Sequence, residues 1–362
     1  MNKKLIAVAV AGACVAPAAM AQTANPVTLY GRVHVTFESV EQDGPTAAVT
    51  QTRRNRVSDQ ASLLGVRGTE DLGGGLKAFF QLETGFKADQ NDTTFAARNS
   101  AVGLQGAWGS ILMGRWDTPY KTVTTAIDPF GDVTLGGYTA AMNGSGVRGV
   151  QGQFDRREQN NVQYWSPSWA GIAFRLSYAA NEGRTATLNP RSNGASVTYT
   201  GGPVYLAYAY HEFKDIAFAG TPATFVKQIA NEIAGSFTFG PIKLGAAYEK
   251  IKRTPGGTFA AMTDHKAWLG DIVWTFGNNQ LIYQYSKAQD GETVGTAQPA
   301  CNVNVAAYQY NFSRRTFFLG QYTKVDNNSV GTCNFGVTPG SIAGNQAGVV
   351  AKGISLGLRH VF

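Results

Sequence analysis

The chain has 362 residues, of which 43 are glycine and only 15% are charged. The 11% of aromatic residues, spread over the whole length, exclude an intrinsically disordered chain, and glycine without a triplet period excludes collagen. The formal net charge is +7, but lysine and arginine are scattered rather than run together, so the charge does not indicate a nucleic-acid partner.

The first predicted element is a secretory signal peptide. Lys3 and Lys4 precede a short apolar stretch over 5–15, and Ala19-Met20-Ala21 has the small-x-small form of a cleavage site. The apolar stretch is shorter than the roughly 20 residues of a transmembrane helix. We therefore expect residues 1–21 to be removed, leaving a mature chain of 341 residues over 22–362 with a formal charge of +5.

Beyond the signal peptide the sequence has no run of 18 apolar residues, which excludes a helical membrane protein. Apolar and hydrophilic residues instead alternate with period 2, as in strands with one apolar face and one hydrophilic face. The clearest alternating segments are 27–38, 76–83, 171–179, 242–249 and 354–362. The alternation leaves two orientations open for 110–115 and for 315–325.

Connections between the alternating segments are short and long in turn. Tight turns rich in Gly, Pro or Asn are predicted at 73–75, 108–109, 168–171, 201–203, 240–241, 277–279 and 313–314. Longer polar connections are predicted at 41–59, 88–98, 116–157, 181–192, 215–225, 253–263, 289–301 and 328–349. Seven short and eight long connections predict sixteen strands.

An even number of antiparallel strands, with short turns at one rim and long loops at the other, is typical of an outer-membrane β-barrel. A sheet in hydrocarbon must close on itself, because the lipid offers no hydrogen-bond partner to its backbone. Aromatic residues near the strand ends, such as Trp268, Trp274 and Tyr285, suit the interfacial girdles of such a barrel. Sixteen strands also leave a water-filled bore. We therefore predict a single all-β domain over 22–362.

The connection over 116–157 is much longer than the others. A segment of this length without predicted structure is uncommon unless it is functional. In a wide barrel such a segment has room in the lumen, so we predict that it folds inward and narrows the pore. The alternative is a mobile surface loop, and by these residues alone the two are about equally favoured.

Several strings resemble the trimeric Gram-negative general diffusion porins of the beta-proteobacterial and neisserial type. The resemblance runs from the signal peptide to the last residue. The matching strings are Thr28 to Gly31, Gly65 to Ala78, Gln81 to Glu83, Val102 to Leu104, Gly114-Arg115, Asn160 to Pro167 with Gly171, and Arg359 to Phe362.

The resemblance implies a sixteen-stranded homotrimer in the outer membrane, in contact with its lipid and lipopolysaccharide. It also implies passive diffusion of ions and small hydrophilic solutes, a constricting third loop at 116–157, and a C-terminal Phe362 read by the outer-membrane assembly machinery. The family often carries Pro-Glu-Phe-Gly-Gly in the third loop. Here the matching place reads Asp128 to Asp132, so the local acid must be Asp128 or Asp132.

Charged residues on the hydrophilic faces of the strands are candidates for lining the pore, because lumen charges set ion selectivity. More basic than acidic side chains are expected there, which predicts a mild anion preference. The candidates are Arg32, Arg67, Lys77, Glu83, Arg175, Lys243 and Arg359, with Arg115 added by the resemblance.

Cys301 and Cys333 are the two cysteines of the mature chain and form a disulfide candidate in an oxidising compartment, with two unpaired thiols as the alternative. The four histidines lie on distant segments, so neither a metal site, nor a cofactor, nor an enzymatic centre is expected. A channel selective for a particular small anion or carboxylate is the nearest alternative function. An adhesin or receptor role of the loops is a further one.

Overall fold

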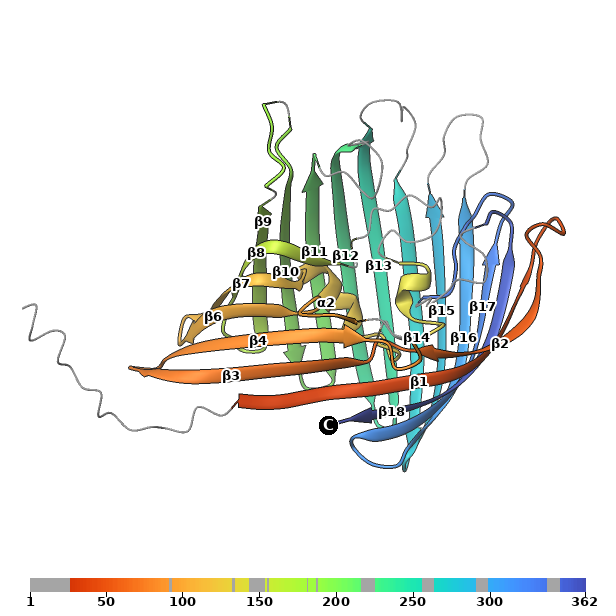
Figure 1. Ribbon diagram of the computed structural model, residues 1–362, viewed down its shortest axis with the longest axis horizontal. Helices are drawn as coiled ribbons and strands as arrows, with labels where there is room; N and C mark the ends of the chain where they lie inside the picture. Colours follow the sequence, from red (N-terminus) through yellow and green to blue (C-terminus); the bar gives the residue numbers. More distant parts are fainter. Residues whose placement is uncertain are drawn as a thin grey trace, which may run out of the picture.

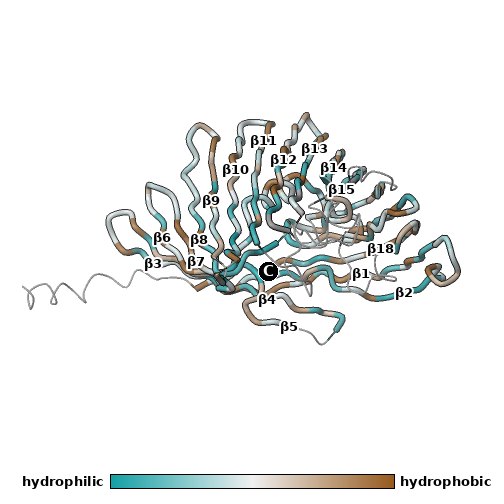
Figure 2. The backbone as a smooth tube through the Cα atoms, turned by 90° about the horizontal axis from the view of Figure 1, so that it is seen from above, coloured by the Kyte–Doolittle hydropathy of each residue, from teal (hydrophilic) through white to brown (hydrophobic). Residues whose placement is uncertain are grey.

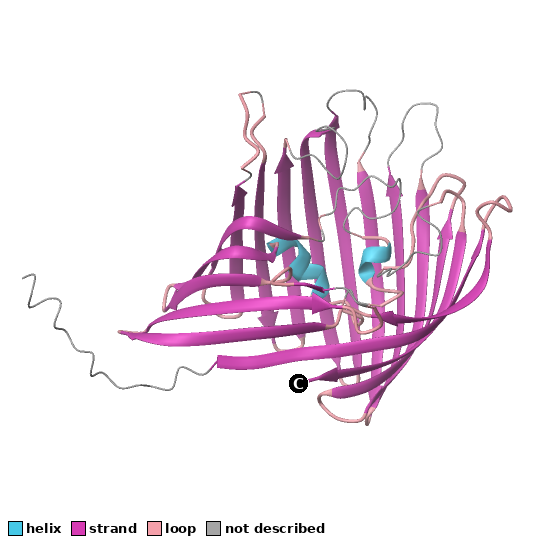
Figure 3. Ribbon diagram, in the orientation of Figure 1, coloured by secondary structure: helices cyan, strands magenta, loops and turns pink. Residues whose placement is uncertain are grey.

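The computed structural model describes residues 27–362 except 91–92, 132–133, 143–153, 155, 181, 187, 216–224, 256–263, 291–298 and 337–345. The predicted signal peptide at 1–21 and Asp132 lie outside the described residues. Strands make up nearly all the regular structure of the described part (Figure 3). None of the helices found there is long and apolar enough to cross a lipid bilayer.

The strands follow one another along the chain and are labelled in Figure 1. In the first half they are β1 (Val27–Asp43), β2 (Gln51–Asp59), β3 (Leu63–Gly73), β4 (Leu76–Phe86), β5 (Thr93–Thr94), β6 (Ser100–Gly106), β7 (Gly109–Asp117), β8 (Arg157–Trp165) and β9 (Ile172–Ala180). In the second half they are β10 (Arg191–Gly201), β11 (Val204–Lys214), β12 (Phe225–Phe239), β13 (Ile242–Pro255), β14 (His265–Phe276), β15 (Asn279–Asp290), β16 (Ala300–Asn311), β17 (Thr316–Asn327) and β18 (Val350–Val361).

Every described pairing is antiparallel, and β1 pairs with β18, so the sheet closes into a barrel (Figure 1). Two of the barrel strands are interrupted. β2 and β3 both pair with β1, and β5 and β6 both pair with β4. Counted as strands of the barrel wall, the described segments are therefore sixteen, and the predicted sixteen-stranded antiparallel barrel is confirmed.

The seven predicted short turns all join neighbouring strands at one rim, and the long connections lie at the other. The predicted connection over 41–59 is wrong, because strands occupy most of it. Residues 41–59 were expected as a loop, but β1 continues to Asp43 and β2 begins at Gln51. The segment Gln51–Asp59 is polar on both faces. It therefore lacks the alternation that lipid contact imposes on the rest of the wall.

Side chains alternate between the outer and the inner face along each strand, and hydrophilic and hydrophobic residues alternate accordingly in Figure 2. In β1, Val33 and Phe37 are exposed on the outer face, whereas His34 and Thr36 are buried on the inner one. The two orientations left open by the sequence are now assigned. Ile111, Met113 and Tyr322 lie on the outer face, while Leu112 and Leu319 are buried inside.

The last residue of the chain completes the closure. Gly31 N donates to Phe362 O at 3.1 Å, and Phe362 N donates to Gly31 O at 3.0 Å. A Cβ atom at Gly31 would lie 2.6 Å from Cζ of the Phe362 ring, so the absence of a side chain at Gly31 makes room for that ring. The barrel is thus sealed by contacts between its first strand and its C-terminal residue.

Candidate pore lumen and constriction loop

The segment between β7 and β8 enters the ring of strands. It carries α2 (Pro119–Thr125) and the 3-10 helix η1 (Tyr138–Ala140), both drawn in cyan within the barrel in Figure 3. Thr118 caps α2 by accepting a 3.2 Å hydrogen bond from the backbone N of Lys121, and Pro119 stands in the first turn, where its missing N–H costs nothing. A capped helix thus forms directly after the strand ends.

The two ends of this loop are anchored by hydrophobic contacts. Tyr120, Val123 and Phe154 of the loop are fully buried in one cluster with Phe213 of β11 and Ile251 of β13. The Phe154 and Phe213 ring centroids lie 4.8 Å apart. Burying aromatic side chains of this size contributes a few kcal/mol each, so the loop is fixed to the wall.

Polar side chains of the wall add to this anchor. Tyr120 Oη donates a 2.9 Å hydrogen bond to Glu249 Oε2, and His265 Nε2 lies 3.2 Å from Glu249 Oε1. The Thr124 hydroxyl donates to a carboxylate oxygen of Glu232. Burial raises the pKa of Tyr120 well above its ordinary value, and the neighbouring carboxylates of Glu249 and Glu232 raise it further. The Tyr120 hydroxyl therefore stays protonated at neutral pH and keeps donating its hydrogen bond to Glu249.

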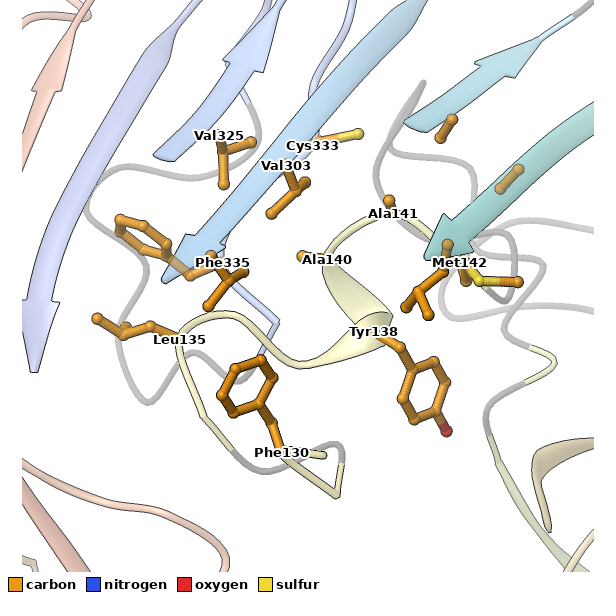
Figure 4. Close-up of a cluster of buried hydrophobic side chains, with 14 of the residues drawn as sticks. Phe130, Leu135, Tyr138, Ala140, Ala141, Met142, Val303, Val325, Cys333 and Phe335 are labelled. Atoms are coloured by element: carbon orange, nitrogen blue, oxygen red, sulfur yellow. The ribbon is translucent and has the colours of Figure 1, made fainter. Parts of the chain in front are cut away.

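The second half of the loop packs on another part of the wall, as Figure 4 shows. Its buried side chains point toward strands β16 and β17 and toward the segment after β17. The labelled contacts from the loop are Phe130, Leu135, Tyr138, Ala140, Ala141 and Met142, and those facing them are Val303, Val325, Cys333 and Phe335. The predicted inward fold of this loop is thereby confirmed for its described residues.

The loop leaves one side of the wall uncovered. α2 contacts β9, β10, β11 and β12, and the second cluster draws its wall residues mainly from β12 to β18. The inner faces of β1 to β7 contribute few residues to either cluster. The described residues of the loop therefore pack mainly on β9 to β18 and not on the N-terminal strands.

Six of the predicted basic residues occupy inner-face positions of their strands. The residues are Arg32 of β1, Arg67 of β3, Lys77 of β4, Arg175 of β9, Lys243 of β13 and Arg359 of β18. They are distributed around the wall rather than gathered at one point.

Three of these arginines contact aromatic rings. The guanidinium carbon of Arg67 lies 5.1 Å from the centroid of the Tyr30 ring. That of Arg175 lies 4.8 Å from Trp165, and that of Arg359 lies 5.3 Å from Phe317. Among the described residues no carboxylate lies within 4.0 Å of these three guanidinium groups, so the ring contacts hold the side chains without neutralising their charge.

Arg115 and Glu83 differ from that pattern. In the strand register Arg115 lies opposite Ser100 and directly follows Gly114, which faces inward. The pairing with β8 shifts register between Gly114 and Trp116. Strand alternation therefore does not assign the Arg115 side chain to the lumen. Its Nε donates to Ala97 O at 2.7 Å. Glu83 is buried on the inner face and forms a 2.6 Å ion pair with Arg98.

Asp128 is buried against the wall of the barrel. Its Oδ1 accepts hydrogen bonds from Gln284 Nε2 at 2.9 Å and from Phe130 N at 3.1 Å. The carboxylate thus fixes the turn of the loop and ties it to β15.

Four further arginines with carboxylate partners and largely buried side chains escaped the sequence analysis, because they lie in segments expected to be connections or at the end of the long loop. The pairs are Arg56 with Glu38 (2.6 Å), Arg98 with Glu83 (2.6 Å), Arg156 with Glu158 (3.0 Å) and Arg157 with Asp117 (3.2 Å). Three of these pairs join segments that only the fold brings together, whereas Arg156 and Glu158 are two residues apart in the sequence.

A disulfide joins Cys301 at the start of β16 to Cys333, with their Cα atoms 6.1 Å apart. Cys333 is buried beside Phe335 in the cluster that receives the loop. Among the described residues, no group of three or more His, Cys, Asp or Glu side chains could hold a metal ion.

Comparisons with known proteins agree with this architecture. Residues 7–329 match the family model described as Gram-negative porin. The chain is 30% identical to outer membrane porin protein 32 of Delftia acidovorans over the full length of both chains. It is 26% identical to a major outer membrane protein P.IB of Neisseria gonorrhoeae, and that match covers 88% of this chain and 92% of that protein. Among solved structures, it resembles the anion-selective porin from Comamonas acidovorans with a TM-score of 0.80 and 26% identity, covering 93% of this chain and 100% of that one.

Proposed function

The chain belongs to the Gram-negative porin family and forms a diffusion channel in the outer membrane, and on that premise we propose that its pore favours small anions over cations. The observation that carries the proposal is the set of inner-face arginines at 67, 175 and 359, which contact aromatic rings instead of carboxylates. Among the described residues, these three positive charges on the inner face of the wall therefore have no carboxylate within 4.0 Å.

Uncompensated positive charge in a narrow, low-dielectric wall attracts anions and raises the barrier to cations. The four paired arginines contribute less, because each carries its own counter-charge. The solved relative described as anion-selective supports the same sign of preference.

The loop at 116–157 is proposed to narrow the lumen in the mature domain over 22–362. Its contacts with β9 to β18 favour a fixed constriction whose opposite side is formed by the basic N-terminal strands. In this proposal Arg32, Lys77 and Lys243 add positive charge along the path. Asp128 acts by holding the loop in shape and not as a charge in the path.

The proposed partners follow from the family. We propose a homotrimer in contact with outer-membrane lipid and lipopolysaccharide, with Phe362 read by the assembly machinery and residues 1–21 removed on export. Ions and small hydrophilic solutes cross the pore passively. We propose no catalytic reaction and no cofactor.

The test is the reversal potential of the purified protein in a planar bilayer with a salt gradient. The expected sign is that of an anion-preferring pore, and a current carried mainly by cations would contradict the proposal. The alternative of a channel selective for one small anion or carboxylate predicts that millimolar amounts of that solute block the chloride current. A general pore predicts large ohmic steps that no single solute blocks.

A further inference from the structure

The loop over 116–157, the constriction loop, is also held by a segment that does not belong to the barrel wall. This segment is the first part of the connection after β17, residues 328–336, and we call it the brace. Gly336 of the brace is hydrogen-bonded to the loop through both of its backbone groups. Its N donates to Leu135 O at 2.9 Å, and its O accepts from the Thr139 hydroxyl at 3.1 Å.

The brace and the loop approach each other closely at this contact. A Cβ atom at Gly336 would lie 2.8 Å from Gly137 O and 3.0 Å from Gly137 N, so the missing side chain lets the two backbones meet. Phe335 is 3% exposed and lies in the hydrophobic cluster with Leu135 and Tyr138 (Figure 4). The position of the brace therefore helps to fix the part of the loop over 135–142.

A disulfide to the barrel wall limits the movement of the brace. Cys333 lies three residues before Gly336 and is bonded to Cys301 at the start of β16. Three residues span at most about 11 Å, so the intact bridge confines Gly336 to the neighbourhood of the loop. Without the bridge, the nearest anchor along the chain is Asn327 at the end of β17, and nine residues reach about 30 Å.

The other described contacts of Cys333 are weaker than a covalent bond. Asn327 Oδ1 accepts a hydrogen bond from Cys333 N at 2.8 Å, and Asn327 Nδ2 donates to Cys333 O at 3.0 Å. The net contribution of one typical hydrogen bond changes an equilibrium only about fivefold. Opening the bridge therefore lets the brace leave the loop for part of the time.

The brace acts on the middle of the loop and not on its ends. Tyr120 and Phe154 are buried against Phe213 and Ile251 of the wall, in a cluster separate from that of Phe335. Release of the brace should therefore loosen the constriction without detaching the loop.

We propose that the Cys301–Cys333 disulfide is a redox-responsive latch that sets how firmly the constriction loop narrows the pore. The proposal rests on the proposed role of the loop as the constriction. The reductant is a low-molecular-weight dithiol on the side of the long connections, which face the cell exterior in barrels of this type.

The exchange reaction is balanced within the bridge and the dithiol. One thiolate of the dithiol attacks a cysteine sulfur, breaks the S–S bond and forms a mixed disulfide, and its second thiol then displaces that cysteine. Two electrons and two protons pass to the bridge. The dithiol leaves as its cyclic disulfide, and Cys301 and Cys333 become thiols.

Burial of the bridge sets the pace of the response. Cys301 is 1% exposed and Cys333 is 5% exposed, so a thiolate reaches the sulfur atoms only when the brace moves. Uncatalysed disulfide exchange takes on the order of minutes to hours. The latch therefore responds to a lasting change of the redox surroundings and not to a brief one.

The test records single-channel currents of the purified protein in planar bilayers before and after incubation with dithiothreitol. Thiol labelling of Cys301 and Cys333 verifies that the bridge has opened. Reduction should make brief changes of the open-channel conductance about fivefold more frequent, the factor expected from the net contribution of one hydrogen bond. Reoxidation with diamide should restore the original record. The double variant Cys301→Ala with Cys333→Ala should match the reduced protein and should not respond to dithiothreitol.

The variant Gly336→Ala separates the brace from the bridge. Its Cβ atom would collide with Gly137, so the brace should leave the loop while the disulfide stays intact. The oxidised variant should therefore show the conductance changes of the reduced wild type. Gly320→Ala on β17 is the matched control, because its Cβ atom would meet other atoms only at 3.5 Å or more. This control should behave like the wild type.

Four outcomes would overturn the proposal. They are a bridge that dithiothreitol leaves intact, an opened bridge with an unchanged current, wild-type behaviour of Gly336→Ala, and a double cysteine variant that still responds to dithiothreitol. The reversal potential of the oxidised protein tests the proposed ion preference separately. An anion-preferring potential with no redox response would reject the latch and leave the proposed function standing. A cation-preferring potential with the expected redox response would do the reverse.

Discussion

The hydroxyl of Tyr120, on the inward-folded loop, donates a 2.9 Å hydrogen bond to Glu249 on the inner face of β13. The two residues are 129 positions apart in the sequence, and both are fully buried. The loop thus depends on a wall residue that lies beneath it, and the stability of this contact decides how firmly the constriction is held.

Replacing Tyr120 by Phe removes that donor while keeping the ring. Leaving a buried carboxylate with one donor fewer costs about 1–3 kcal/mol, so the loop should leave the wall more often. The expected result is greater open-channel current noise and closure at a lower applied voltage in planar bilayers. Tyr205→Phe is the control, because that hydroxyl makes only a 3.5 Å contact with Val123 O. Equal noise in both variants would contradict the role of Tyr120.

Titration of Tyr120 gives a second prediction. Burial and the carboxylates of Glu249 and Glu232 raise the pKa of this phenol in the folded state above its ordinary value near 10. The resulting stabilisation is fully present below pH 10 and is lost as the pH rises toward the folded-state pKa. Thermal unfolding midpoints between pH 9 and 12 should therefore fall more steeply for the wild type than for Tyr120→Phe. Parallel curves would show that the phenol does not contribute.

Arg67 and Arg359 are expected to set ion preference. Replacing both by Gln removes two charges that lack a carboxylate partner, while the barrel keeps its shape. The anion-to-cation permeability ratio from reversal potentials should fall severalfold, because lumen charges control entry. As a control, Arg314→Gln removes a charge from the short turn between β16 and β17. If both changes lower the ratio equally, general surface charge and not the lumen determines the preference.

Neutralising Glu83 should change the anion-to-cation permeability ratio in the opposite direction. Replacing it by Gln leaves Arg98 without its 2.6 Å counter-charge, so the lumen gains a positive charge. The permeability ratio should rise, and the double variant with Arg98→Gln should return it to the wild-type value. A fall in the ratio for Glu83→Gln alone would exclude Arg98 from the conducting path.

The Cys301 to Cys333 disulfide closes a segment of 32 residues. In the loop-entropy account such a bridge contributes about 3–4 kcal/mol by restricting the unfolded chain. Replacing both cysteines by Ala should lower the thermal unfolding midpoint and speed proteolysis after β17. Adding a reductant to the wild type should reproduce the faster proteolysis, and reductant should not affect the double variant. Unchanged proteolysis in the double variant would contradict a structural role of the bridge.

The strands could be predicted from the sequence because lipid and water impose opposite demands on the two faces of the wall. Val33 and His34 differ in polarity for that reason, and the alternation is visible without any knowledge of the partner strand. Where the alternation is weak, as over Gln51–Asp59, the sequence predicts a loop although the segment forms a strand.

Contacts between segments distant in the sequence could not be predicted in the same way. Phe154 and Leu135 are apolar residues in a long connection, and only the folded wall shows which surface buries them. Asp128 was expected beside the pore from its place in a family string, yet Gln284 holds it against β15. The sequence likewise does not show that Lys250 and Lys266 lie directly opposite each other, since only the register of β13 and β14 sets this pair.

The paired hydrogen bonds between Gly31 and Phe362 have a consequence for biogenesis. β1 pairs with β18 over twelve residue pairs, so the barrel cannot close until the last strand of the chain has been made and exported. An incomplete chain therefore presents two open seams, which must be shielded from other nascent polypeptides during transit. Removal of Phe362 alone would abolish both of these hydrogen bonds and leave the twelve residue pairs between the two strands to hold the seam.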